Sequence, residues 1–165
     1  MPKFYFTPRG VDRIEERRRA LRGQLREIQG EKGEAAEVGG NQWHDNFSFE
    51  ELSRQEMMLN SQIAELNRIM DNMVIVRTVS SDADHLSIGQ VAVLDLAGER
   101  KAFRVGGYDE SDLEANPPMI AYNAPLIAPF IGAEAGHQEV IYIGGVARQA
   151  TLEEILTEVR DEDRS

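Results

Sequence analysis

The sequence predicts an α+β protein in which a hairpin of two long helices precedes a small β-rich domain. Apolar residues recur in heptads through roughly the first 73 residues, which is the spacing of helices that pack along a shared seam. From residue 74 onward the pattern changes to a period of two and to short apolar runs, which favours strands. We therefore expect a coiled-coil hairpin over residues 1–77, with its tip at 38–49, and a second domain over residues 78–165.

The first helix is expected to begin at Thr7-Pro8, where a capping residue precedes a proline at the first helical position. No later proline interrupts the heptads before the pair Gly39-Gly40, which should end the helix. The stems of two basic residues are expected to continue the apolar seam. The seam positions are Val11, Ile14, Arg18, Leu21, Leu25, Ile28, Lys32 and Ala35.

A second heptad pattern predicts a helix from about Phe47 to about Met73. Each helix would be about 40–45 Å long, at a rise of about 1.5 Å per residue. Two such helices joined by a short link must lie antiparallel. The seam positions of the second helix are Leu52, Glu56, Leu59, Ile63, Leu66, Met70 and Met73.

The expected tip carries unusual chemistry for a helix connection. Residues 39–49 read Gly-Gly-Asn-Gln-Trp-His-Asp-Asn-Phe-Ser-Phe and include the single tryptophan of the chain. Aromatic residues there indicate either insertion into a partner or local packing under the turn. His44 and Asp45 are two neighbouring metal donors, but a metal site would need further ligands from a partner. A structural role for this pair is the alternative.

Four segments of the second half are expected to form strands, and glycines separate them. Residues 127–131 predict a short helix. The segment Thr151–Val159 is open to two interpretations: a strand over 147–155, or a helix capped by Thr151. The expected strands are Val74–Val79, Val91–Leu96, Phe103–Val105 and Val140–Ile143.

Composition excludes several classes of function. The 29 acidic and 18 basic residues give a formal net charge of -11, which argues against a plain nucleic-acid binder. The absence of cysteine excludes disulfides, thiolate catalysis and cysteine-ligated zinc. There is no apolar run long enough to span a membrane and no signal pattern in residues 1–10, so we expect a soluble cytoplasmic protein.

Charge is distributed unevenly between the two halves. Residues 1–80 hold 12 basic and 13 acidic residues, whereas residues 81–165 hold 6 and 16. This difference indicates two domains that face different partners. A basic run in the first helix is either a solvated face or a surface near nucleic-acid phosphates. The run consists of Arg17, Arg18, Arg19, Arg22 and Arg26.

No set of nucleophile, base and orienting residue stands out, and there is no glycine-rich phosphate loop. His85 and His137 are expected to be solvated. Four aromatic residues of the second half are expected in the core or in a docking surface. They are Tyr108, Tyr122, Phe130 and Tyr142.

Several segments, taken in order, resemble one known family. The start Phe6–Gly10 resembles its T-x-x-G helix start, and Asp45–Phe49 is similar to its tip motif E-N-A-E-Y. In the second half the similar motifs are S-I-G-S-x-V-x-V at Ser87–Val93, Y-x-I-V-G at Phe103–Gly107, I-S-x-x-S-P-L at Ile120–Leu126 and L-L-G-x-x-x-G-D at Ile131–Gly136. The chain thus resembles, over nearly its whole length, the Gre family of bacterial transcript-cleavage factors.

This resemblance implies a function as an accessory factor that is not itself an enzyme. The second domain would have an FKBP-like fold and dock on a coiled coil of the β′ subunit of RNA polymerase, at the secondary channel. The docking residues would be Asn123, Ala124, Pro125 and Leu126. The hairpin would reach the active centre and the nascent RNA 3′ end, where the polymerase hydrolyses backtracked RNA. The factor would bind no cofactor alone but share a Mg²⁺ ion with the polymerase.

The tip departs from the family pattern at the acidic positions. The residues that would face the active centre are Gln42, Trp43, His44, Asp45 and Asn46. Asp45 stands where the family has glutamate and is a possible Mg²⁺ ligand, whereas the neutral Gln42 stands where the family has aspartate. The pattern therefore favours regulation or inhibition slightly over efficient stimulation of cleavage. One alternative is an FKBP-like chaperone, prolyl isomerase or binding module, whose apolar pocket could be lined by Tyr108, Tyr122, Phe130 and Tyr142. Another is an autonomous metal hydrolase using His44 and Asp45.

Overall fold

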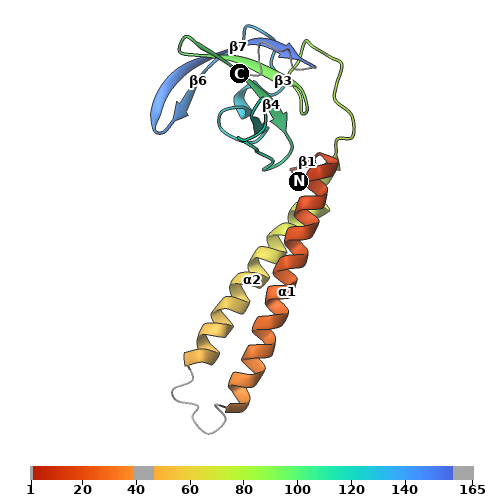
Figure 1. The fold of residues 1–165 in the computed structure, drawn as a ribbon, viewed down its shortest axis with the longest axis vertical. Helices are drawn as coiled ribbons and strands as arrows, with labels where there is room; N and C mark the ends of the chain where they lie inside the picture. Colours follow the sequence, from red (N-terminus) through yellow and green to blue (C-terminus); the bar gives the residue numbers. More distant parts are fainter. Residues whose placement is uncertain (1, 39–46, 158–165) are drawn as a thin grey trace. The chain divides into compact units, whose positions relative to one another are not determined.

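The computed structural model describes residues 2–38 and 47–157. The chain divides into two compact units. The first consists of Met1–Phe4 and Val11–Met73, and the second of Tyr5–Gly10 and Val74–Ser165. The first therefore holds most of two long helices, and the second holds the strands of a five-stranded sheet together with a short N-terminal segment (Figure 1).

Helix α1 spans Pro8–Val38 and begins where the capping pattern predicts. The side-chain oxygen of Thr7 accepts a hydrogen bond from the backbone N–H of Gly10 at 3.1 Å, which satisfies one of the free donors of the first turn. Pro8 has no N–H to satisfy, and its ring holds φ near the helical value. The predicted start of the first helix is thus confirmed.

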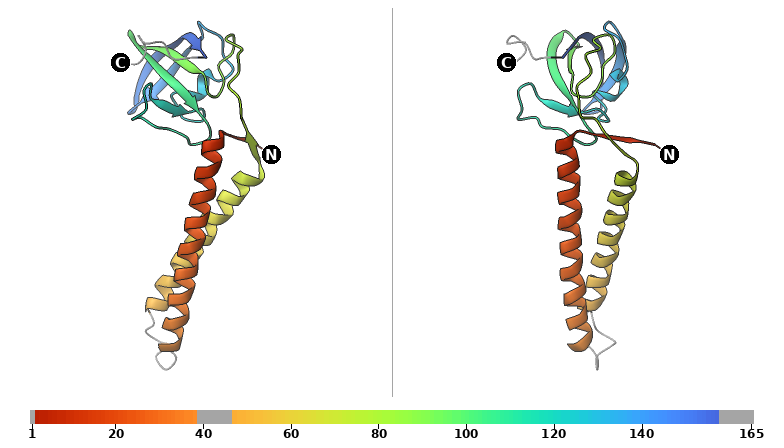
Figure 2. Two further views of the ribbon diagram at one scale, coloured as in Figure 1. Left: turned by 45° about the vertical axis from the view of Figure 1, so that its right-hand side comes forward. Right: turned by 90° about the vertical axis from the view of Figure 1, so that its right-hand side faces the viewer.

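Helix α2 spans Phe47–Asp71 and runs antiparallel to α1. Arg18, early in α1, donates to Asn67, late in α2, at 3.1 Å, while Lys32 lies 3.4 Å from Glu56. Figure 2 shows the two helices side by side from two further directions. These pairs place the aliphatic stems of Arg18 and Lys32 between the helices, as the seam pattern predicts. The helical hairpin is therefore confirmed.

The hairpin buries few apolar side chains. Among the residues of this unit that the structure describes, they are Phe4, Ile14, Leu21, Leu59 and Ile69. The heptads predict three of the four helical residues but not Ile69. The helix ends two residues earlier than predicted, at Asp71, where the Asn72 side chain donates to the Arg68 carbonyl at 2.8 Å. Strand β1 (Phe4–Phe6) also meets this end, because the Phe4 N–H donates to the Asn72 carbonyl at 3.0 Å. The heptad pattern of the two helices does not predict strand β1.

Strand β1 pairs with β2 (Met73–Ile75) in a two-stranded sheet. The predicted strand over 74–79 is wrong in its length. Since β1 has three residues, it offers partners to only a short segment, and the last contact is from the Val76 N–H to the Phe6 carbonyl at 2.7 Å. Sequence patterns did not indicate β1, which is short and precedes the helix directly.

The main sheet has five strands in the order β5-β4-β3-β7-β6. The pairs β3–β4, β3–β7 and β6–β7 are antiparallel, while β4 and β5 are parallel. The predicted strands at 91–96, 103–105 and 140–143 are confirmed, and the ambiguous segment near residue 151 is a strand. The bounds are β3 (Val91–Leu96), β4 (Glu99–Gly106), β5 (Met119–Ala121), β6 (Gln138–Ile143) and β7 (Val146–Leu156).

The core of the second unit surrounds the central strand β3, whose residues Val91–Leu94 are fully buried. The short 3₁₀ helix η1 (Ala128–Phe130) lies where a short helix is expected, and its Phe130 is also fully buried. The predicted α+β class, with a helical hairpin before a small β-rich domain, is confirmed. The core cluster comprises Leu86, Ala92, Leu94, Leu96, Phe103, Val105, Ile127, Phe130, Ile141, Ala150, Leu152 and Ile155.

Candidate functional site

The predicted tip residues lie outside the residues that the structure describes. They are Gln42, Trp43, His44, Asp45 and Asn46. The helix ends that flank this segment are described. Phe47, the first residue of α2, leaves 77% of its surface exposed. The first turn of α2 contacts α1 through Phe49, because the Lys32 ammonium lies 5.1 Å from the centre of the Phe49 ring.

Two neighbouring acidic residues, Glu50 and Glu51, lie near the start of α2. The Glu51 carboxylate accepts hydrogen bonds from Arg54 at 2.6 and 3.0 Å and from Gln55 at 3.1 Å. The Arg54 guanidinium and then the Gln55 amide lower the pKa of Glu51 to about 2. This carboxylate is therefore ionised but already engaged within its own helix. Glu50, by contrast, is exposed and makes no hydrogen bond to a described residue.

The predicted docking segment follows the short strand β5 and forms a tight turn. The Ala124 N–H donates to the Ala121 carbonyl at 3.0 Å, and the Ala128 N–H donates to the Ala124 carbonyl at 2.8 Å. Asn123 and Pro125 are exposed, whereas Leu126 is half-buried and packs against the core cluster. The turn therefore presents one amide side chain and one proline ring on a base that the core holds in place.

A reciprocal pair of hydrogen bonds joins this turn to the loop after β4. The backbone N–H of Asp109 donates to the Asn123 side-chain oxygen at 3.0 Å, and the Asn123 amide donates to the Asp109 carboxylate at 2.8 Å. Asp109 has a φ of 50°, in the left-handed region that aspartate and asparagine tolerate better than most residues. The motif at Ile120–Leu126 identified Asn123 as a candidate docking residue. Its hydrogen-bond partner, Asp109, was not indicated by any sequence motif.

The neighbouring Glu110 is buried and fully engaged. Its carboxylate accepts the Gly107 N–H at 3.0 Å and the Thr7 hydroxyl at 2.8 Å. Thr7 is the residue that caps α1, so its oxygen accepts from Gly10 while its hydroxyl donates to Glu110. The sequence motif at Phe103–Gly107 lies close to Glu110 but ends three residues before it. The motif therefore did not indicate the role of Glu110.

Glycine is required where this loop leaves β4. A Cβ on Gly106 would lie 2.1 Å from the Glu110 carbonyl oxygen, and one on Gly107 would lie 3.0 Å from the Thr7 backbone nitrogen. The loop continues with the Tyr108 N–H, which donates to the Tyr5 carbonyl at 2.7 Å. Close backbone packing on the N-terminal segment therefore fixes the loop that carries Asp109 and Glu110.

The four aromatic residues considered for an isomerase pocket lie in different environments. Phe130 is fully buried in the core, and Tyr142 on β6 is 70% exposed. The Tyr122 hydroxyl accepts the Tyr5 N–H at 3.1 Å, and partial burial raises the pKa of Tyr122. Tyr108 packs beside Phe6, with ring centres 5.7 Å apart. These placements are those of core and surface residues, so they offer no support for the isomerase interpretation.

Both described histidines are exposed, as predicted, and both lie beside acidic residues. His85 lies 3.2 Å from Asp82 and 3.4 Å from Glu134, and His137 lies 2.8 Å from Glu139. The Asp84 N–H and then His85 lower the pKa of Asp82. Within residues 2–38 and 47–157, there is no group of three or more histidine, cysteine, aspartate or glutamate residues arranged to hold a metal ion.

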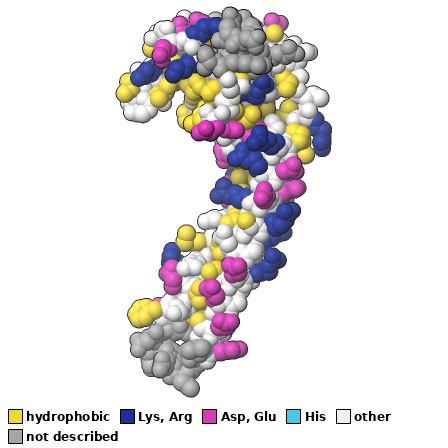
Figure 3. Space-filling model, in the orientation of Figure 1, with side chains coloured by type: hydrophobic (Ala, Val, Ile, Leu, Met, Phe, Trp, Pro, Cys, Tyr) yellow, Lys and Arg dark blue, Asp and Glu magenta, His cyan; other side chains and the backbone are white. Residues whose placement is uncertain are grey.

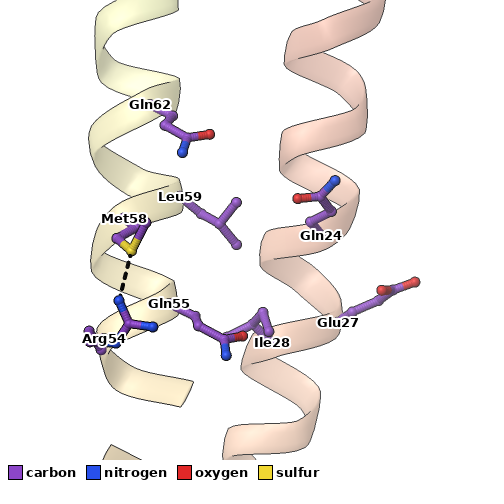
Figure 4. Close-up of a pocket in the computed structure, with 8 residues that line it drawn as sticks. All are labelled: Gln24, Glu27, Ile28, Arg54, Gln55, Met58, Leu59 and Gln62. Atoms are coloured by element: carbon purple, nitrogen blue, oxygen red, sulfur yellow. Dashed lines mark hydrogen bonds between the residues drawn. The ribbon is translucent and has the colours of Figure 1, made fainter. Parts of the chain in front are cut away.

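A cavity of about 310 Å³ lies between the two helices (Figure 4). Several of its side chains are amides, and the Arg54 guanidinium lies 3.1 Å from the Met58 sulfur. Neither a nucleophile nor a histidine is among the lining residues, so we assign the cavity no chemistry. They are Gln24, Glu27 and Ile28 of α1, and Arg54, Gln55, Met58, Leu59 and Gln62 of α2.

The arginines of the two helices differ in their partners. On α2, Arg54 and Arg68 pair with glutamates three residues earlier, at 2.6 and 2.7 Å. On α1, six exposed arginines form no ion pair with any residue in the described part of the chain. Figure 3 shows basic side chains gathered along α1. The six are Arg9, Arg13, Arg17, Arg19, Arg22 and Arg26.

The chain is similar to a curated protein, the transcription elongation factor GreA of Aliarcobacter butzleri (strain RM4018). The two are 30% identical over 97 residues, which cover 57% of this chain and 58% of the relative. The match therefore spans somewhat more than half the length of each protein. No family model matches the chain.

The similar solved structures have low sequence identity and modest TM-scores. The Gfh1 protein of Thermus thermophilus is 18% identical, with 93% of this chain and 99% of that chain covered and a TM-score of 0.42. Gfh1 of Thermus aquaticus is 18% identical, with 94% and 99% covered and a TM-score of 0.42. The elongation factor GreA/GreB from Nitrosomonas europaea is 12% identical, with 93% and 99% covered and a TM-score of 0.39.

Fold and sequence define a class of protein with a helical hairpin followed by a domain built on a five-stranded β-sheet. The curated relative confirms the predicted resemblance to the Gre family of transcription elongation factors. None of the helices within the described residues is long and apolar enough to cross a membrane.

Proposed function

We propose that this chain is a Gre-like transcription elongation factor that binds bacterial RNA polymerase at its secondary channel. It would insert the hairpin tip toward the active centre and modulate both elongation and the cleavage of backtracked RNA. The observation that carries the proposal is the long antiparallel hairpin in a chain similar to GreA. At about 1.5 Å per residue, α1 with its 31 residues is roughly 46 Å long, long enough to reach into a deep channel.

Docking is assigned to Asn123, Ala124, Pro125 and Leu126, with the β′ coiled coil of the polymerase as the partner. Two features support this assignment. The turn exposes the side chains of Asn123 and Pro125, and its backbone is held by hydrogen bonds to Ala121 and Ala128. A surface whose bound shape already exists loses less conformational entropy on binding. The division into domains at residues 77 and 78 belongs to the same proposal.

The hairpin would supply groups to the polymerase and not catalyse hydrolysis itself. Mg²⁺ prefers hard oxygen ligands, and a second Mg²⁺ can activate the attacking water. The tip offers one carboxylate, from Asp45, beside the neutral amide of Gln42. One carboxylate does not make a site for the ion on the free factor, so the polymerase would have to provide most ligands. Glu51 cannot readily replace the absent acid, because Arg54 and Gln55 engage its carboxylate.

Within this function, regulation or inhibition is favoured slightly over efficient stimulation of cleavage. Replacement of an acid by Gln42 removes one negative charge that would help to attract a metal ion. Trp43 is large enough to obstruct a narrow channel. Cleavage with a different ligand set, including His44, is the other outcome.

The nascent RNA 3′ end is a further proposed partner, since a tip at the active centre would approach it. The six unpaired arginines of α1 support contact with polyanions. Arginine forms bidentate hydrogen bonds with phosphate and stays charged at all physiological pH values. Any such contact should weaken as salt concentration rises.

The test is RNA cleavage in halted, backtracked elongation complexes of the cognate polymerase. Wild-type protein is compared with an Asp45→Ala variant, and with a Glu50→Ala variant as a matched acidic control near the tip. We expect the wild type to bind the complexes and to leave cleavage unchanged or lower it. Cleavage that rises with the wild type and disappears with Asp45→Ala would show a working ligand set instead. Failure of the wild type to bind polymerase would overturn the proposed function.

A further inference from the structure

The docking turn does not stand alone in the second unit. Asn123 and Asp109 exchange two hydrogen bonds, one through the Asp109 backbone N–H at 3.0 Å and one through its carboxylate at 2.8 Å. Both residues are exposed, so these bonds are formed at the surface where either side chain could turn to water instead. Two bonds in a fixed geometry restrict the Asn123 side chain to one rotamer.

The Asp109 side of this pair rests on rigid supports. The preceding Gly106 and Gly107 pack so closely on backbone atoms of Glu110 and Thr7 that a Cβ would not fit without a shift. The following Glu110 is buried and accepts hydrogen bonds from Gly107 and Thr7. The loop therefore holds Asp109 in place independently of Asn123. Through the two hydrogen bonds, the fixed Asp109 restrains the Asn123 side chain.

The Asn123 side is supported more weakly. Its neighbour Tyr122 accepts a single hydrogen bond from the Tyr5 N–H, and the turn after Asn123 begins with the Ala124 N–H donating to Ala121. Neither contact involves the Asn123 side chain. Asp109 is thus the residue that decides where this amide points.

We propose that Asp109 is a positioning residue for the docking segment. This inference rests on the proposed function, because it assumes that Asn123 contacts the polymerase. Asp109 holds the Asn123 amide oriented before binding, so that the complex forms without the loss of side-chain freedom that a mobile amide would suffer. The proposed docking surface thus depends on a residue of the loop after β4 as well as on residues 123–126.

The test is a double-mutant cycle on affinity for core RNA polymerase, measured by competition with a labelled wild-type factor. Asp109→Gly removes the carboxylate but suits the positive φ, so backbone strain is avoided. Asp109→Asn keeps a side-chain oxygen that can accept from Asn123 and also tolerates this φ. Asp84→Gly is the matched control, since the exposed Asp84 carboxylate accepts no hydrogen bond from a described residue.

We expect Asp109→Gly to weaken binding by about 3- to 10-fold, the value of roughly one hydrogen bond. Asp109→Asn should bind nearly as the wild type does, and Asp84→Gly should have no effect. In an Asn123→Ala background, Asp109→Gly should change the affinity no further, because the group that Asp109 positions is then absent. The thermal midpoint of each variant, measured without polymerase, separates positioning from a loss of folding.

Three results would overturn the inference, and they are distinguishable. Unchanged binding by Asp109→Gly means that Asn123 needs no support. Equal weakening in the wild-type and Asn123→Ala backgrounds means that Asp109 acts independently of Asn123. Absence of binding by the wild type itself removes the proposed function as well, whereas the first two results leave that function intact.

Discussion

The two units of this protein are stabilised in different ways. The β unit packs twelve buried residues into one core cluster, and its central strand is fully buried over Val91–Leu94. The hairpin unit buries four helical side chains and relies on polar pairs such as Arg18 with Asn67 and Lys32 with Glu56. Buried apolar area is the main source of folding free energy, so the β unit should be the more stable of the two.

This difference is consistent with a division of tasks. A docking surface keeps its shape when a rigid core supports it, whereas an element that enters a partner can be less stable. Regions with few buried apolar contacts open at lower free energy than the core. The proposed docking turn accordingly lies on the core of the β unit, through the half-buried Leu126, and the proposed tip segment belongs to the hairpin.

The largest expected effect is at the centre of the β unit. Phe130→Ala removes a fully buried aromatic side chain and should lower the free energy of unfolding by about 3–5 kcal/mol. Phe47→Ala, at a residue that is 77% exposed, should change it by less than about 0.5 kcal/mol. Urea denaturation, monitored by far-ultraviolet circular dichroism, measures the change in the free energy of unfolding for both variants. Similar values for the two variants would contradict the assigned core.

A smaller effect is expected within the hairpin. Leu59→Ala should destabilise the helices by about 2 kcal/mol, at the low end for buried leucine, because Leu59 already borders the cavity between them. Met57→Ala on the same helix, where the side chain is 75% exposed, is the matched control. Hydrogen exchange of the α1 and α2 amides gives the change for this unit alone. A loss larger than that of Phe130→Ala would reverse the comparison between the units.

The smallest effect is electrostatic and concerns the first turns of α2. The pKa of Glu51 lies at about 2, below its usual value of 4.5, because Arg54 and Gln55 stabilise the carboxylate. The contribution to stability is therefore fully present above about pH 4.5 and is lost as pH falls toward 2. An NMR titration of the Glu51 side chain should show this low midpoint.

The matched variant for this titration is Arg54→Ala. Without the guanidinium, the Glu51 midpoint should move toward the ordinary value, and the helix should lose less of its stability on acidification. Because the pair is exposed, solvent and salt screen it, and the effect should shrink at high ionic strength. An unchanged midpoint in Arg54→Ala would show that Arg54 does not perturb Glu51 in solution.

Local patterns in the sequence were sufficient for the main elements. Thr7-Pro8 predicts the start of α1, since a cap and a proline at the first position depend only on neighbouring residues. The seam residues Ile14, Leu21 and Leu59 follow from the heptads, and the short apolar runs predict β3 and β6.

What the patterns missed depends on contacts between distant segments. The burial of Ile69 accompanies the pairing of β1 beside the end of α2. The segment near Thr151 became a strand because β3 and β6 both pair with it, a choice that its own residues left open. Propensity is a weak guide where two partners supply hydrogen bonds.

The sequence by itself determined the two helices, strands β3 and β6, the seam of the hairpin and the resemblance to the Gre family, because periodicity, caps and motifs are local properties. Only the tertiary structure decided that Thr7 binds the carboxylate of Glu110, 103 residues away, and that Asp109 holds Asn123. Such pairs form where the folded backbone brings two loops together. No spacing within either loop specifies which residue of the other it will meet.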